Sequence, residues 1–104
     1  MEGIIKAGGR EIRVKNTASA LYIYKAQFGR DFLADVQRMR SDDAVDVLDV
    51  MGVVWAMAKN ADKSVVGFVE WIDSFGMADF AGEGTIKAVM DFVGGSLAVD
   101  RKNE

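Results

Sequence analysis

The alternation of apolar and polar residues over the first fifteen positions predicts a β-hairpin. Gly8-Gly9 supplies the two residues with positive φ that a tight two-residue turn requires. Such a turn places Ile5 opposite Ile12, and Ile5, Ile12 and Val14 then share one apolar face. Because an isolated hairpin is marginal in water, we expect this one to pack against the rest of the chain or to pair with another strand.

Apolar residues recur at helical spacing from residue 16 to residue 98, and Gly, Ser, Thr and Asn punctuate the pattern. The chain of 104 residues fits one domain, residues 1–104. We predict the α+β class, mainly α, with an N-terminal β-hairpin (1–15), four to five packed helices (16–98) and a frayed tail (99–104). The predicted helices run from Thr17 to Phe28, Asp31 to Arg40, Asp42 to Lys59 with Ser41 as cap, Ser64 to Phe75, and Thr85 to just before Gly94-Gly95.

The predicted helix from Asp42 to Lys59 changes character along its length. Its first half is amphipathic, with Val47 and Leu48 expected to face inward and the acidic stripe of Asp42, Asp46 and Asp49 expected to face solvent. Its second half is apolar on every side, so it is either the central helix or part of an interface. The residues expected to be mostly buried are Leu21, Tyr24, Phe28, Leu48, Met51, Val54, Trp55, Val69 and Ile72.

Composition removes several classes of function. The net charge is −3 and the pI is about 4.9, which argues against nucleic acid as the main partner because phosphate binding needs clustered Lys and Arg. The chain has no Cys and no His, so a thiolate metal site and the commonest general base are both excluded. We see no signal peptide, and the longest apolar run, residues 50–58, is far short of the roughly 20 residues of a membrane span. We therefore expect a cytosolic protein.

Three features that resemble catalytic or ligand sites have simpler explanations. The acidic stripe complements a helix dipole and otherwise forms a solvated face. Gly82-Glu83-Gly84 near Lys87 lacks the Gly-Lys-Ser/Thr ending of a phosphate loop and precedes a helix instead. Glu70 and Asp73 are carboxylates at helical spacing on a solvated face. We therefore predict that the protein is not an enzyme and needs no metal or cofactor.

The aromatic residues are more informative. Trp71 is predicted to lie at the edge of the apolar face of its helix, where it is either a core residue or an anchor for a partner, since Trp is enriched at interface hot spots. Trp55 is expected to belong to the core. The apolar helix and a second apolar strip through Ala20, Ile23 and Ala26 exceed what one small core covers, so we also predict a homo-oligomer.

Three short strings of residues stand in order along the chain: Phe28-Gly29-Arg30-Asp31, Trp55-Ala56-Met57-Ala58-Lys59 with Ala61-Asp62, and Glu70-Trp71-Ile72-Asp73 with Phe75. In their order and approximate spacing they resemble a family of phage tail assembly chaperones found in siphophages and in prophages of Gram-positive bacteria. The similarity spans roughly residues 10 to 93. Gly82-Glu83-Gly84 and Gly94-Gly95 depart from the family pattern.

The resemblance implies a binding function in phage tail assembly. A member of this family would bind the tape measure protein, a long helical protein that is poorly soluble before the tail tube closes round it, and would help to recruit the tail tube protein. It would work in the host bacterial cytoplasm and be absent from the mature virion. From these strings and the second apolar strip, the candidate partner-binding residues are Ile23, Phe28, Arg30, Trp55, Lys59, Trp71 and Phe75.

The alternative is a small bacterial helical adaptor or regulatory module that binds one partner helix. A DNA-binding regulator is disfavoured by the negative charge and by the lack of a basic recognition helix. A very long, helix-rich reading frame immediately downstream would favour the chaperone, and its absence would favour the adaptor.

Overall fold

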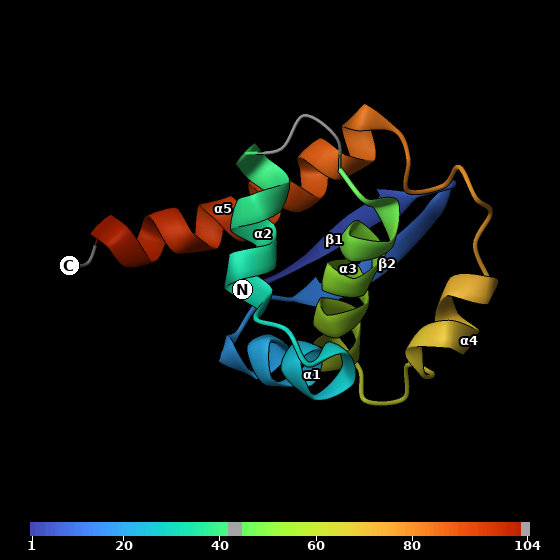
Figure 1. Ribbon diagram of the computed structural model, residues 1–104, viewed down its shortest axis with the longest axis horizontal. Coiled ribbons are helices and arrows are strands. Elements are labelled where there is room, and N and C mark those ends of the chain that lie inside the picture. Colours follow the sequence, from blue (N-terminus) through green and yellow to red (C-terminus); the bar gives the residue numbers. More distant parts are fainter. Residues whose placement is uncertain (42–44, 103–104) are drawn as a thin grey trace.

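The computed structural model describes the backbone of residues 1–41 and 45–102, and side chains as far as residue 95. In that part of the chain, an antiparallel two-stranded hairpin is followed by five helices (Figure 1), which confirms the predicted α+β, mainly helical class. The elements are β1 (Glu2–Ala7), β2 (Arg10–Lys15), α1 (Ala18–Phe28), α2 (Phe32–Ser41), α3 (Val47–Ala61), α4 (Phe68–Asp73) and α5 (Glu83–Lys102).

The hairpin has the predicted register. Gly8 and Gly9 have φ of 56° and 76°, the positive values that a two-residue turn of the favoured hand requires. Ile5 faces Ile12, and both are buried together with Val14. The hairpin thus presents one continuous apolar face to the helices.

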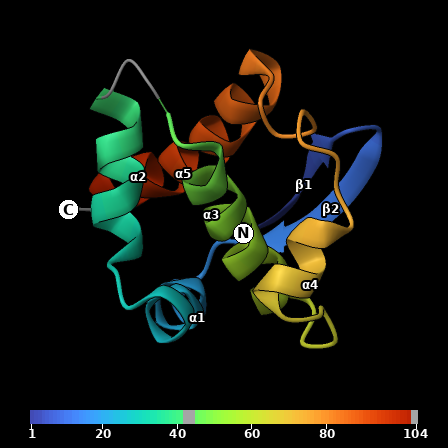
Figure 2. The same ribbon diagram turned by 45° about the vertical axis from the view of Figure 1, so that its right-hand side comes forward.

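Helix α3 occupies the centre of the molecule, which is the first of the two positions that its apolar sequence allows. Every residue from Asp49 to Ala58 is buried. The helix packs on β2 and against α1, with α2 and α4 on either side of it in the view of Figure 2, while α5 lies along β1. Gly52 allows a close approach of α1, because a Cβ atom there would lie 3.2 Å from the Phe28 ring.

The start of α3 differs from the prediction. Asp46 is the N-cap, and its carboxylate accepts a hydrogen bond of 2.9 Å from the backbone N–H of Leu48. Ser41 ends α2 instead, where its hydroxyl donates to backbone carbonyls of the preceding turn. Residues 42–44, which the sequence predicts to belong to this helix, lie outside the described part of the chain. The expectation that Asp49 faces solvent is wrong, because its side chain is buried between α2 and α3.

The last two helices also differ in length. Helix α4 begins after Gly67 rather than at Ser64, whose backbone N–H and hydroxyl both donate to the Asp62 carboxylate in a turn. Helix α5 runs through Gly94-Gly95 to Lys102, whereas the sequence predicts a helix end before Gly94 and a frayed tail from residue 99. A helical Gly costs only about 1 kcal/mol relative to Ala, which is too little to stop a helix by itself.

Of the nine residues predicted to form the core, four are buried, three are partly buried and two are exposed. Tyr24, Met51, Val54 and Trp55 are buried, and the partly buried Leu21, Phe28 and Ile72 pack against them. Leu48 and Val69 are 56% and 73% exposed, so their assignment to the core is wrong. Periodicity identifies the apolar positions of a helix, but it does not reveal which of them a neighbouring element covers.

Two truncations on α3 test this arrangement. Met57 is fully buried, so Met57→Ala should lower the free energy of unfolding by roughly 2–5 kcal/mol. Leu48→Ala should cost about 0.5 kcal/mol or less, as an ordinary surface change does. Urea unfolding followed by circular dichroism measures both. A larger loss for Leu48→Ala than for Met57→Ala would mean that α3 is rotated relative to this structure.

Candidate protein-binding groove

An open groove lies between the first turns of α3 and helix α4. It encloses about 840 Å³, within the range of ligand and peptide sites. Most of its lining is apolar. The lining side chains come from α3 (Val47, Leu48, Met51), from α4 (Val69, Glu70, Ile72, Asp73) and from the segment that follows α4 (Phe75, Met77).

The groove gathers three of the most exposed large apolar side chains in the described part of the protein. Leu48 is 56% exposed, Val69 73% and Met77 100%. Apolar residues scattered singly over a surface need no explanation, whereas a contiguous group that lines one depression marks an interaction site. The groove is therefore the strongest candidate for a functional site in the described residues.

An aromatic cluster fixes the N-terminal end of α4. The Phe68 ring lies 4.8 Å from the Phe28 ring and 5.8 Å from the Trp55 ring, measured between centroids. The Trp55 indole N–H also donates to the Val66 carbonyl at 2.9 Å, and the Lys59 ammonium donates to the Val65 carbonyl at 2.5 Å. These bonds hold the loop before α4 against α3.

A second cluster fixes the other end of α4 to the hairpin. The Phe75 ring lies 4.8 Å from Trp71 and 5.1 Å from the fully buried Phe80. The Arg10 guanidinium lies 3.9 Å from the centre of the Phe75 ring and donates to the Ser74 carbonyl at 3.2 Å. With both ends of α4 attached, the groove has two helical walls held by packing in the free protein.

Most of the candidate residues chosen from the sequence therefore support the groove without lining it. Trp55 and Trp71 are 4% and 6% exposed, so the placement of Trp71 at the border of the surface is wrong. Phe75 alone among the seven candidates lines the groove. Ile23 is partly buried on α1, and its neighbour Ala20 in the second apolar strip is buried, so the predicted strip does not form one exposed face.

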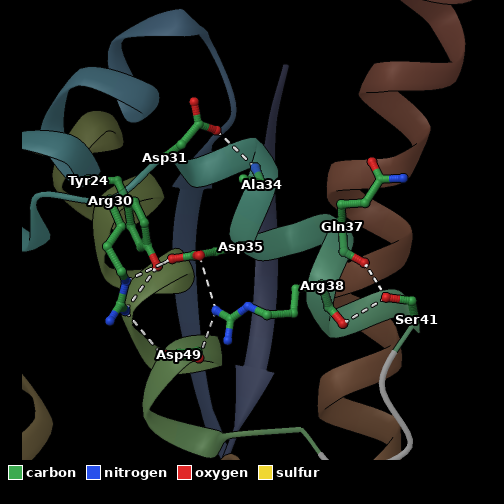
Figure 3. A network of polar contacts seen from close by, with 9 residues as sticks. All are labelled: Tyr24, Arg30, Asp31, Ala34, Asp35, Gln37, Arg38, Ser41 and Asp49. Atoms are coloured by element: carbon green, nitrogen blue, oxygen red, sulfur yellow. Dashed lines mark hydrogen bonds and ion pairs between the residues drawn. The ribbon is translucent and has the colours of Figure 1, made fainter.

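Arg30 belongs to a network of charges between the helices (Figure 3). Its guanidinium contacts Asp35 at 2.9 Å and Asp49 at 3.0 Å, and Arg38 contacts the same two carboxylates at 3.0 and 3.2 Å. The Tyr24 hydroxyl donates to Asp35 at 2.5 Å. Burying a carboxylate is costly unless it is paired and hydrogen-bonded, and each of these two has two arginine partners. Arg30 thus joins α2 to α3.

The network shifts the pKa values of Asp35 and Tyr24 in opposite directions. Burial alone would raise the pKa of Asp35, but the hydrogen bonds from Tyr24, Arg30 and Arg38 outweigh it and hold that pKa below its usual value. Burial, reinforced by the bond to Asp35, raises the pKa of Tyr24 to about 12. Asp35 is therefore ionised at neutral pH and Tyr24 keeps its proton, as the short bond between them requires.

Sequence reasoning missed the groove because it assigned Leu48 and Val69 to the core. One signal could have corrected the first assignment. Asp is a better N-cap than most residues, and a helix that starts after Asp46 places Leu48 in its first turn. Side chains in a first turn have few neighbours from their own helix. We find no comparable sequence signal for Val69.

No protein family, curated protein or solved structure matches the chain. Among the described residues, no group of three or more Asp or Glu side chains could hold a metal ion. No helix in the same part of the chain is long and apolar enough to cross a membrane. The absence of enzymatic activity stays a prediction from the sequence.

Replacing Asp35 tests the charge network. Its pKa is lower in the folded than in the unfolded protein, so its stabilising contribution is present above the unfolded value of about 4 and is lost as pH falls through the folded value. Asp35→Asn should cost roughly 3 kcal/mol at pH 7, because it leaves the two arginines with one carboxylate. Urea unfolding at pH 7, 5 and 3 should then show a smaller acid-dependent loss for Asp35→Asn than for the wild type.

The matched control is Asp91→Asn, which removes an exposed carboxylate paired with Lys87 on α5. It should change stability at pH 7 by about 0.5 kcal/mol or less and leave the acid-dependent loss near that of the wild type. Equal behaviour of the two variants would contradict the role given to the network.

Proposed function

We propose that the protein is a tail assembly chaperone of a siphophage or prophage and binds the tape measure protein in the groove between α3 and α4. The observation that carries the proposal is the open apolar groove, with Leu48, Val69 and Met77 exposed in the free chain. The ordered strings of residues that resemble this chaperone family supply the identity of the partner.

The groove suits a helical partner. Its walls are two helices, and an amphipathic helix can lay its apolar side chains into a depression of this kind at positions i, i+3, i+4 and i+7. A tape measure protein, as the resemblance implies, exposes long apolar helices before the tail tube closes round it. Covering such a stripe would keep the partner soluble, because buried apolar area is the main driving force for both aggregation and binding.

The residues of the family resemblance have a structural role in this proposal. Trp55, Lys59, Trp71 and Phe75 attach α4 and its flanking loops to the rest of the protein. They build the groove, and Phe75 also lines it, while the three exposed side chains that would contact a partner, Leu48, Val69 and Met77, lie outside the strings of the resemblance. The same proposal includes the tail tube protein as a second partner and self-association of the chaperone. It also places the action of the chaperone in the host cytoplasm, before the virion is complete.

Two exposed side chains allow a test that spares the fold. We expect the double variant Leu48→Gln, Met77→Gln to retain at most about a tenth of the tape measure protein that the wild type retains on co-expression and affinity purification. A tenfold loss corresponds to about 1.4 kcal/mol, a modest value for two interface side chains. Both substitutions remove apolar groups without adding charge, and both sites are mostly exposed.

The control is Tyr22→Gln, which removes a side chain that is 75% exposed on α1 and lies outside the groove. It should retain the tape measure protein as the wild type does. If the wild type itself does not retain that protein, the chaperone proposal fails and the helical adaptor becomes the better explanation of the groove. If both variants bind as the wild type does, the partner docks elsewhere.

A further inference from the structure

We infer that the groove selects an amphipathic helix with Lys or Arg along one flank of its apolar stripe, and that this basic flank lies against α4. The inference rests on the proposed function and specifies the chemistry of the partner segment. The charged side chains among the described lining residues are Glu70 and Asp73, and neither Lys nor Arg lines the groove in that part of the chain.

The two carboxylates form a row along α4 beside an apolar row. Val69 and Ile72 are three residues apart, and so are Glu70 and Asp73. Residues at this spacing lie on the same side of a helix, about 4.5 Å apart along its axis. A partner helix with basic residues three or four positions apart would therefore meet both carboxylates while its apolar stripe contacts the neighbouring row.

The charge is confined to one wall, which gives the bound helix an orientation. The lining residues from α3 are Val47, Leu48 and Met51, and all are apolar. The α4 wall carries both acids, and both side chains are exposed. In the described part of the chain, neither Glu70 nor Asp73 forms a salt bridge with another residue of the protein. They are thus available to a basic partner, and a helix with acidic residues at the same flank would be repelled.

Two synthetic peptides test the preference directly. Both are 18-residue amphipathic helices with the same stripe of Leu, and one flank of the stripe carries Lys in the first peptide and Glu in the second. We expect the wild type to bind the Lys peptide roughly tenfold more tightly in fluorescence anisotropy, as two exposed ion pairs allow. The preference should shrink in 0.5 M salt because the charges are screened.

Charge reversal supplies the decisive comparison. The variant E70K/D73K should prefer the Glu peptide. The control E11K/E83K has the same net charge, and its two exposed substitutions lie outside the groove, so it should keep the preference for the Lys peptide. Equal binding of both peptides to the wild type, or the same preference in E70K/D73K, would overturn the inference.

Three further results separate this inference from other occupants and from the proposed function. If the wild type binds neither peptide and forms a dimer that the Leu48→Gln, Met77→Gln variant loses, the groove holds a second copy and the inference is wrong. If the tape measure protein binds but the peptides show no charge preference, the inference fails and the chaperone proposal stands. If the charge preference holds while the tape measure protein is not retained, the inference holds and the chaperone proposal fails.

Discussion

A helix that is apolar on every side must be covered on every side, and α3 imposes this requirement on the rest of the chain. The hairpin and α1 supply most of the cover, and α2, α4 and α5 complete it over residues 49–58. The cover ends at the first turn of α3, where Leu48 is exposed. The candidate binding groove lies at this first turn, where the rest of the chain leaves the central helix partly uncovered.

The buried charges determine which side of α3 meets that groove. Asp49 lies on the side of α3 that Arg30 and Arg38 approach. Successive residues of a helix are about 100° apart, so pairing Asp49 with these arginines turns Leu48 away from α2. The charge network lies outside the groove, yet it orients the apolar residues of α3 that line one wall. Two aromatic clusters hold α4, the other wall, in place.

Turn chemistry and apolar periodicity, which depend on residues close together in the sequence, were enough to predict the hairpin and most of the helices. The Gly8-Gly9 turn fixed the register of the hairpin, and apolar periodicity located α1, α2 and the buried half of α3. The exposed positions of Leu48 and Val69, and the burial of Asp49, depend on which elements become neighbours in space. A helix pattern contains no information on that point. Trp55 and Trp71, chosen from the sequence as candidate partner-binding residues, are therefore buried supports of the groove, and Phe75 alone among the candidates lines it.

A fluorescent label at one position in the groove tests whether the partner docks there. The chain has no Cys, so Met77→Cys gives a single attachment site for an environment-sensitive dye, and Tyr22→Cys gives a matched site on α1. We predict that the tape measure protein shifts the emission of the dye at residue 77 to shorter wavelength and leaves the emission of the dye at residue 22 unchanged. A shift at residue 22 with none at residue 77 would contradict it.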